Sequence, residues 1–239
     1  MDIRQARLLA AIIDQFIDTA IPVGSKKLLE SAEFAVSSAT IRSEMAELED
    51  LGFLEQPHVS AGRIPTIQGY RVYVQEFMKP SAHERAVQQK FQELKQQYFQ
   101  HKDRERVYEA VALLSNMIPN VSFATVPHRD QVYYLGLSNA MQQPEFLTDG
   151  RFTSGVVEVL EKQLTKLISR ITLTDNVQYF IGEKDLCPQF SSCSMLVTKY
   201  RIRDQVGAIG ILGPVRMDYA YNTVALEMAA GLLRDMETN

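Results

Sequence analysis

The sequence predicts an α+β protein made of two domains that are joined by a helix. Three observations support this prediction. Residues 1–79 contain short amphipathic helical patterns, residues 82–118 are polar with apolar residues at heptad-like spacing, and residues 119–239 mix strand patterns with two long helices. The chain has 239 residues, which suits one large domain or two small ones.

The overall composition is that of an ordinary globular protein. Hydrophobic residues make up 46% of the chain and charged residues 23%, which argues against wholesale disorder and fibrous repeats. With 25 Lys and Arg against 29 Asp and Glu, the formal net charge is −4. This balance argues mildly against a protein that coats nucleic acid through bulk charge, but it is compatible with a local basic patch.

The cysteine and hydropathy patterns predict a reduced cytoplasmic protein. Cys187 and Cys193 are too few for a disulfide framework or a Cys₄ zinc site, so we expect idle or buried thiols. No apolar run approaches the ~18 residues of a membrane span. Asp14 and Asp18 interrupt the N-terminal stretch where a signal peptide needs its apolar core. We therefore expect no membrane contact, no metal and no cofactor.

Residues 1–79 predict a series of short helices. The first is amphipathic and spans about residues 4–19, and Ser25 caps a short second helix. Ser37 or Ser38 caps a third helix, and Gly52 is placed just past its end. The apolar stripe of the third helix is formed by Ile41, Met45 and Leu48.

A hairpin and a fourth helix are expected next. Short extended pieces at residues 53–56 and near Ile64 flank the loop 57–63, whose Pro, Ser and Gly suit an exposed position. Thr66 caps a fourth helix with an apolar face. Three helices followed by a hairpin loop predict a winged helix-turn-helix domain over residues 1–79.

Residues 80–118 predict a linking helix. Its apolar side chains repeat at heptad-like spacing and are Val87, Phe91, Leu94 and Tyr98. Two heptads are too few to identify a coiled coil, so the stripe fits either a dimerisation helix or a helix packed on its own chain.

Residues 119–239 predict a sheet that is covered by helices. The expected strands are residues 121–126, 131–137, 177–182, 194–201 and 205–212. The expected helices are residues 155–171 and 219–236. Asp218 is expected to cap the last helix, with Arg216 as a nearby ion partner.

The third helix carries the first candidate functional residues. Hydroxyl side chains and one arginine crowd its N-terminal half, namely Ser37, Ser38, Thr40, Arg42 and Ser43. A recognition helix enters the major groove with its N-terminal residues leading, so these side chains can reach phosphates and base edges. The acidic residues follow in the C-terminal half, away from the duplex. The same residues also fit a capped helix with a solvated charged face.

Two further elements complete a candidate DNA-binding surface. The second helix begins with Ser25, Lys26 and Lys27, and its ammonium groups suit the phosphate backbone. The loop carries His58, Ser60 and Arg63 and no acidic residue, which suits backbone or minor-groove contact. An isolated His58 is also common as an ordinary exposed side chain. Clustering of the basic residues on these elements would give a positive face to a domain with a net negative charge.

Long ordered motifs run through both halves of the chain. In the first half they are PVGSK at 22–26, VSSATIR at 36–42, MAELE at 45–49, LEQPHVSAGRIPT at 54–66 and GYR at 69–71. In the second half they are YLGLSN at 134–139, QPEF at 143–146 and IGILGPVRMDY at 209–219. Together they strongly resemble the HrcA family of heat-inducible transcription repressors, whose pattern has Thr where this chain has Val215.

The resemblance implies a fold, a function and partners. Residues 119–239 would form a GAF-like α/β sheet domain. The protein would repress heat-shock (chaperone) genes by binding an inverted-repeat DNA operator as a homodimer, and heat stress would release it. A GroEL-type chaperonin would assist its folding or activity.

One departure from the family pattern concerns dimerisation. Family members carry a long additional segment between the parts that match residues 121–126 and 133–139, including an inserted dimerisation domain. Here only residues 127–132 connect the two parts. This chain is thus a short member, and we expect the helix at 82–107 and the GAF-like surface to form the dimer instead.

Other functions are less well supported by the residues. Gly207, Gly210 and Gly213 lack the spacing of a dinucleotide site, and no nucleophile–base pair can be proposed, so we expect no enzyme. Two alternatives stay open: a ligand-responsive regulator whose GAF-like domain binds a metabolite, and an interaction module without DNA binding. A polar-lined cavity in the sheet domain would favour the ligand, whereas a core filled by side chains would favour a ligand-free domain.

Overall fold

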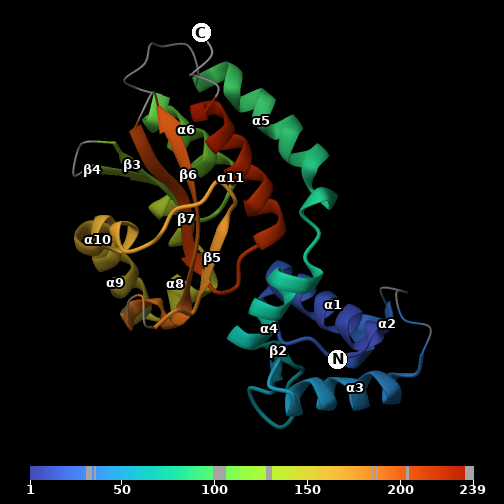
Figure 1. The fold of residues 1–239 in the computed structure, drawn as a ribbon. Helices are drawn as coiled ribbons and strands as arrows, with labels where there is room; N and C mark the ends of the chain where they lie inside the picture. Colours follow the sequence, from blue (N-terminus) through green and yellow to red (C-terminus); the bar gives the residue numbers. More distant parts are fainter. Residues whose placement is uncertain are drawn as a thin grey trace. The chain divides into compact units, whose positions relative to one another are not determined.

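The computed structural model describes residues 1–30, 34, 36–98, 106–127, 131–184, 186, 188–202 and 205–234 (Figure 1). The chain divides into two compact units, Met1–Lys79 and Pro80–Asn239. The first unit is helical with one small hairpin, and the second is built on a five-stranded sheet, so the chain is an α+β protein as predicted. Cys187 and residues 128–130 and 203–204, which lie between expected strands, are outside the described residues.

The first unit begins with α1 (Ile3–Thr19). Asp2 caps this helix, because its side chain accepts a hydrogen bond from the Gln5 N–H at 2.8 Å while the Gln5 side chain accepts one from the Asp2 N–H at 3.0 Å. One face of the helix is apolar and fully buried, and it includes Leu8, Leu9, Ile12 and Ile13.

Two further helices, α2 (Ser25–Glu30) and α3 (Ser38–Asp50), complete the core of the first unit. The expected stripe of Ile41, Met45 and Leu48 is buried. Gly52 follows α3 with a φ of +79°, a left-handed conformation that favours glycine, and this turn leads the chain into the hairpin.

The hairpin is short and is held at its base. β1 (Leu54–Glu55) pairs antiparallel with β2 (Ile64–Pro65), and Arg63 exchanges two backbone hydrogen bonds of 2.9 Å with Val23. A side chain at Gly62 would place its Cβ 2.3 Å from the Val23 carbonyl oxygen, so only glycine fits this close approach. The loop between β1 and β2 is therefore anchored to the segment that precedes α2.

After the hairpin, Thr66 caps α4 (Ile67–Val72), as predicted. Its Oγ1 accepts a hydrogen bond from the Gly69 N–H at 3.1 Å and donates one to the Gly52 carbonyl at 2.6 Å. The helix continues as one π-helical turn, η1 (Tyr73–Phe77). The Tyr73 hydroxyl donates to Asp14 at 3.0 Å, which ties this last turn to α1.

The second unit contains an entirely antiparallel sheet with the strand order β4-β3-β7-β6-β5. The strands are β3 (Val121–Val126), β4 (Gln131–Leu135), β5 (Gln178–Ile181), β6 (Cys193–Ile202) and β7 (Gln205–Pro214). All five were expected from the sequence. Burial of Cys193 in β6 agrees with the expectation of a buried thiol.

Helices cover both faces of this sheet (Figure 1). α6 (Arg106–Met117) and α11 (Tyr219–Arg234) pack on one face. α9 (Gly150–Glu158), η3 (Val159–Gln163) and α10 (Leu164–Ser169) pack on the other, over a core that includes Phe123, Met195 and Val197. Successive side chains of each strand point to opposite faces of the sheet, so every strand contributes to the core beneath both layers of helices.

Residues 80–118, expected to form one linking helix, instead contain two helices, α5 (Glu84–Tyr98) and α6, and both belong to the second unit. Val87 and Phe91 on α5 are 0% and 3% exposed, and α5 packs on α6 and α11. Val87 and Phe91 of the heptad-like stripe are thus covered within the chain, whereas Leu94 is half-buried and the side chain of Tyr98 lies outside the described residues.

Three local details differ from the sequence-based prediction. The helix expected at 155–171 begins at Gly150, because the Asp149 side chain accepts hydrogen bonds from the N–H groups of Arg151 and Phe152, and a π-helical turn interrupts it. Two helices of about one turn, α7 (Leu137–Ala140) and α8 (Pro144–Thr148), are too short for a periodic pattern to show.

Among the described residues no helix is both long and apolar enough to cross a membrane.

The loop before α11 also differs in its ion pair. Asp218 accepts a hydrogen bond from the Tyr221 N–H at 2.9 Å, as expected for a cap. Arg216, however, pairs with Glu145 on α8 at 2.6 Å and not with Asp218. Spacing along the chain could not reveal this pairing, because Glu145 lies far from Arg216 in the sequence.

Candidate DNA-binding surface

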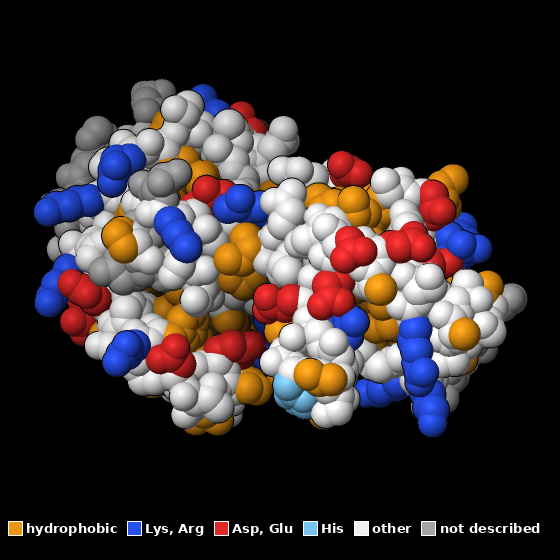
Figure 2. Space-filling model, turned by 90° about the horizontal axis from the view of Figure 1, so that it is seen from below, with side chains coloured by type: hydrophobic (Ala, Val, Ile, Leu, Met, Phe, Trp, Pro, Cys, Tyr) orange, Lys and Arg blue, Asp and Glu red, His pale blue; other side chains and the backbone are white. Residues whose placement is uncertain are grey.

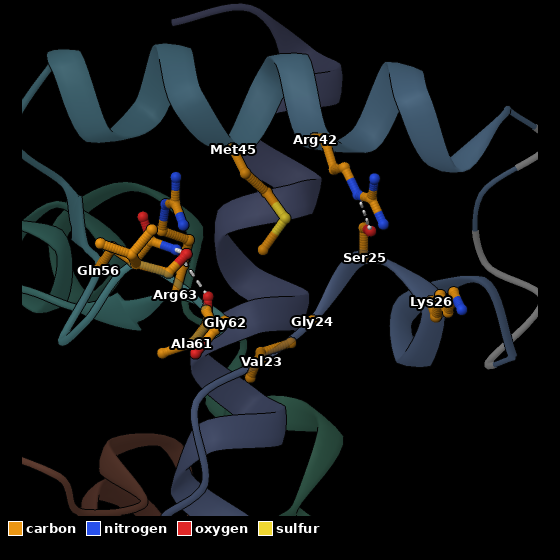
Figure 3. A pocket seen from close by; sticks show the side chains of 12 residues that line it. Val23, Gly24, Ser25, Lys26, Arg42, Met45, Gln56, Ala61, Gly62 and Arg63 are labelled. Carbon is orange, nitrogen blue, oxygen red and sulfur yellow. Dashed lines mark hydrogen bonds between the residues drawn. The ribbon is translucent and has the colours of Figure 1, made fainter.

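A groove of about 500 Å³ lies between α2, α3 and the loop that joins β1 to β2 (Figure 3). Five of the predicted residues line it, namely Ser25, Lys26, Arg42, Ser60 and Arg63. Lys27, Ser43 and His58 are exposed but do not line the groove. The structure therefore brings residues from all three predicted elements to one place.

The hydroxyl groups at the start of α3 are mostly engaged within the unit. Ser37 caps the helix: its Oγ accepts from the Thr40 N–H at 3.1 Å and lies 2.9 Å from the Thr40 Oγ1. Ser38 Oγ lies 3.0 Å from the Oγ of Ser25. Ser43 differs from these, since it is exposed and no hydrogen bond to another described residue engages its hydroxyl. It is the hydroxyl best placed to meet a ligand.

Arg42 and Ser25 meet in the groove. Figure 3 shows the Arg42 side chain reaching from α3 toward the start of α2, where its Nε donates to the Ser25 Oγ at 3.1 Å. Arg42 is exposed, whereas Ser25 is only 6% exposed. Ser25 is therefore a support for Arg42 more than a surface of its own.

The exposed face of α3 around Arg42 is made of small side chains. Ala39, Ser43 and Ala46 are all exposed there, one turn before, beside and one turn after Arg42. Short side chains let a helix approach a partner closely, and alanine can contact the methyl group of thymine. Sequence reasoning overlooked Ala39 and Ala46, although their spacing of three and four residues from Arg42 places them on its face.

Arg63 has a different setting from the one expected at a loop tip. Its Nη2 lies 2.8 Å from a carboxylate oxygen of Glu49 on α3, and its side chain is only 18% exposed. Together with the backbone pairing to Val23, this ion pair ties the base of the hairpin to α3. Arg63 is thus a structural anchor of the loop in this structure.

The tip of the loop is exposed and internally braced. The Gln56 side chain donates hydrogen bonds to the carbonyl oxygens of Val59 and Ala61 at 3.0 and 2.8 Å. Ser60 Oγ lies 3.3 Å from His58 Nδ1. Val59 is 97% exposed. The bracing gives these tip side chains a defined place on the surface.

Acidic side chains of α3 are paired inside the unit. Glu44 pairs with Arg4 and Glu49 with Arg63, while Glu47 accepts a hydrogen bond from Gln5 at 2.8 Å. Figure 2 shows acidic and basic side chains interspersed on the face that it presents, with no large patch of one sign. The local basic surface of Lys26, Lys27 and Arg42 is therefore small, and its positive potential is helped by the arginines that neutralise Glu44 and Glu49.

In the second unit the sheet face toward α9, η3 and α10 is filled by a continuous cluster of buried side chains, including Phe146, Leu160 and Leu167. Within the described ranges, no group of three or more His, Cys, Asp or Glu side chains is arranged to hold a metal ion. An open groove of about 530 Å³ lies outside this cluster, between α5, the end of α6 and the α7–α8 segment.

Comparison with known proteins identifies relatives over almost the whole chain. A heat-inducible transcription repressor HrcA from Symbiobacterium thermophilum is 27% identical, with 99% of this chain and 98% of that protein aligned. The alignment covers 341 positions although the chain has 239 residues, so that relative has segments with no counterpart here. An HrcA protein from Chloroflexus aurantiacus is 38% identical over 138 residues, covering 56% of this chain and 36% of that protein.

A structural superposition and a family model both support the relationship of this chain to these proteins. A crystal structure of a hypothetical protein superimposes with a TM-score of 0.79 and covers 100% of this chain and 99% of its own, at 17% identity, which shows a shared fold. The model of the HrcA protein C terminal domain matches residues 74–222, more than half of the chain. The chain therefore belongs to the HrcA family of heat-inducible transcription repressors.

Proposed function

We propose that the first unit is a winged helix-turn-helix domain that binds double-stranded DNA. In this assignment α2 and α3 are the helix-turn-helix pair, and the hairpin β1–β2 is the wing. The observation that carries the proposal is the shared groove, where Lys26, Arg42 and Ser60 come together from three separate elements.

The contacts within this surface fall into three groups. Lys26 and Lys27 are exposed cations at the start of α2 and would contact phosphates. Arg42 and Ser43 on α3 would read base edges, flanked by Ala39 and Ala46. His58, Val59 and Ser60 at the loop tip would contact the backbone or the minor groove.

Five of the predicted contact residues would act through others. Ser37 and Thr40 form the cap of α3, and Ser38 and Ser25 support Arg42. Arg63 anchors the loop through Glu49. Their hydrogen bonds and ion pairs are already made, so we assign them the positioning of the contact surface.

The family relationship supports the wider function. We propose that the chain represses heat-shock genes by binding an inverted-repeat operator as a homodimer in the cytoplasm, and that heat stress releases it. The second unit would be the GAF-like domain. A GroEL-type chaperonin as a folding partner is carried over from the resemblance of the sequence to this family.

An electrophoretic mobility shift tests DNA binding most directly. The full chain is titrated against an inverted-repeat operator from upstream of a chaperone gene of its own genome, and against a scrambled duplex of the same composition, at one stated salt concentration. Tighter binding of the operator supports the proposal. Equal affinities for the operator and the scrambled duplex would contradict sequence-specific DNA binding.

The dimer requires its own measurement. Sedimentation of the chain at micromolar concentration, with and without operator, should give the mass of a dimer at least on DNA. A monomer in both conditions would contradict the dimeric repressor. The buried stripe on α5 implies that the contact lies elsewhere than on Val87 and Phe91.

The ligand-responsive alternative is less well supported. It calls for a cavity inside the sheet domain, but the sheet face beneath α9, η3 and α10 is packed with side chains. This packing favours a second unit that acts without an internal ligand.

A further inference from the structure

Arg42 is held on one side of its guanidinium and open on the other. Its Nε donates to the Ser25 Oγ at 3.1 Å, whereas Nη1 and Nη2 have no hydrogen-bond partner among the described residues. The side chain is exposed and lines the groove (Figure 3). The two Nη groups therefore form a donor fork with a fixed direction.

Ser25 is fixed in turn by α3. It is 6% exposed, and its Oγ lies 3.0 Å from the Oγ of Ser38 in the first turn of that helix. A serine hydroxyl has one donor and two acceptor sites, so Ser25 can accept from Arg42 while it exchanges a hydrogen bond with Ser38. The three residues form a hydrogen-bonded chain in which Ser25 at the start of α2 links Arg42 to Ser38, both on α3.

We propose that Ser25 is the positioning residue that makes Arg42 a reader of guanine. The proposal rests on the DNA-binding function proposed above. Two parallel arginine donors match O6 and N7 of guanine in the major groove, a pair of acceptors that no other base offers there. A guanidinium that is already held loses less rotamer freedom when it makes this contact. Base discrimination by α3 thus depends on a buried serine that touches no base.

The neighbouring side chains allow the approach that this contact requires. Ala39, Ser43 and Ala46 surround Arg42 on the exposed face of α3, and all three are short. Arg42 is longer than each of these three neighbours, so it reaches the base edges before them.

The experiment uses a duplex chosen by the protein itself. The full chain selects its preferred sequence from a random pool, and single substitutions locate the guanine on which binding depends. That guanine is then replaced by 7-deazaguanine, which lacks the N7 acceptor but keeps Watson–Crick pairing. The readout is the ratio of the two dissociation constants at one salt concentration.

Four variants separate positioning from folding and from charge. Ser25→Ala removes the support, and Arg42→Ala removes the reader. Arg42→Lys keeps the positive charge but lacks the fork. Thr66→Ala is the matched control, because it also removes a hydroxyl with two hydrogen bonds from the first unit, yet it has no contact with Arg42. Circular dichroism confirms that each variant is folded at the assay temperature.

We expect 7-deazaguanine to weaken the parent and the Thr66→Ala variant by about tenfold, within the range of a bidentate arginine–guanine contact. The Ser25→Ala and Arg42→Ala variants should lose less than about twofold, because the fork is misdirected or lost, whereas Arg42→Lys should fall between them and the parent, because an ammonium group can still contact N7. An equal loss in the parent and in Ser25→Ala would overturn the role of Ser25.

Other outcomes are also decisive. If no guanine of the selected duplex is sensitive to 7-deaza replacement in the parent, Arg42 does not read guanine and the inference is wrong. If the pool yields no duplex that binds more tightly than random DNA, the proposed DNA-binding function itself fails, and the inference fails with it.

Discussion

At the scale of single residues, the candidate surface is defined by which polar groups are left unpaired. Three of the acids of α3 have partners inside the first unit, and the hydroxyls of Ser37, Ser38 and Thr40 have partners within a turn or across to α2. A polar group that has already exchanged water for a protein partner gains less from a ligand. The exposed cations and Ser43 are the groups that remain for DNA.

Lys26 tests the electrostatic part of the surface. Because it would contact a phosphate and no base, Lys26→Ala should weaken operator and random DNA by similar factors, and it should lower the salt dependence of binding by about one ion. Binding titrations over a range of salt concentrations measure both effects. Lys79→Ala, which removes an exposed cation at the end of the first unit, is the control and should change neither. A loss confined to operator DNA would make Lys26 a base reader instead.

The Glu49–Arg63 ion pair tests the anchoring of the loop. The pair is partly buried, with side chains 33% and 18% exposed, so we expect a coupling energy of about 1 kcal/mol in a double-mutant cycle of Glu49→Ala and Arg63→Ala. Urea unfolding of the full chain, followed at the transition of the first unit, gives the four stabilities. Asp50→Ala, on the next and exposed residue, controls for loss of charge.

The two roles of Arg63 make opposite predictions for Glu49→Ala. If Arg63 only anchors the loop, releasing it should leave DNA affinity unchanged or lower it. A gain in affinity beyond that of Asp50→Ala, lost again when Arg63 is also replaced, would show that Arg63 contacts phosphate once it is freed.

At the scale of elements, α5 shows how an apolar stripe can have two interpretations. Its residues repeat at heptad-like spacing, but Val87 and Phe91 are covered by α6 and α11. Heptad spacing only places side chains on one side of a helix, and it does not say whether the covering surface belongs to the same chain or to a second one.

Phe91→Ala distinguishes these possibilities. Loss of this buried ring should destabilise the second unit by about 3–5 kcal/mol without changing the oligomeric state at which the parent sediments. Thermal unfolding and sedimentation are the two measurements. Gln92→Ala, on the exposed side of the same helix, should alter neither. A stable variant that has lost its partner chain would instead place Phe91 in a dimer contact.

Two residues of the family motifs donate hydrogen bonds to backbone carbonyl groups at the end of α6. Its last carbonyl groups and those just after it accept hydrogen bonds from Asn139, Lys90 and Gln143, at 3.3, 2.9 and 2.6 Å. The final carbonyls of a helix have no partner within the helix, so side chains must supply one. Asn139 and Gln143 lie in the motifs YLGLSN and QPEF, and this role gives both a structural reason.

At the scale of the whole molecule, heat release would follow from unfolding of the DNA-binding unit. The groove needs α2, α3 and the hairpin in place together, so binding should be lost over the same temperature range in which the first unit melts. Circular dichroism and fluorescence anisotropy of labelled operator, recorded on one sample, compare the two curves. Binding that persists well above heat-shock temperature would exclude intrinsic sensing.

A destabilising variant makes this comparison sharper. Leu48→Ala removes a fully buried side chain of α3 that does not line the groove, and it should cost about 2–5 kcal/mol. Both the melting curve and the loss of operator binding should move to lower temperature by the same amount. Displacement of only one curve would separate binding from folding.

The sequence by itself determined most of the elements and the chemical character of the surface, but not the two helices within residues 80–118 or the short helices α7 and α8. Caps at Thr66 and Asp218, a cap at Ser37 or Ser38, and all five strands could be identified in advance, because capping and alternation depend on neighbours a few residues away. The family could also be identified, since its motifs are long and local. The net charge of −4 said little, because the position of a few cations matters more than their number.

Only the tertiary structure decided how these residues are used. Glu49 pairs with Arg63, Arg216 pairs with Glu145, and α5 packs within its own chain. Each of these contacts joins segments that are separated along the sequence and meet in the folded chain. The same holds for Ser25, whose burial turns a predicted contact into a support for Arg42. Local patterns report which groups are polar or apolar, whereas pairing and burial are set by the long-range contacts of the folded chain.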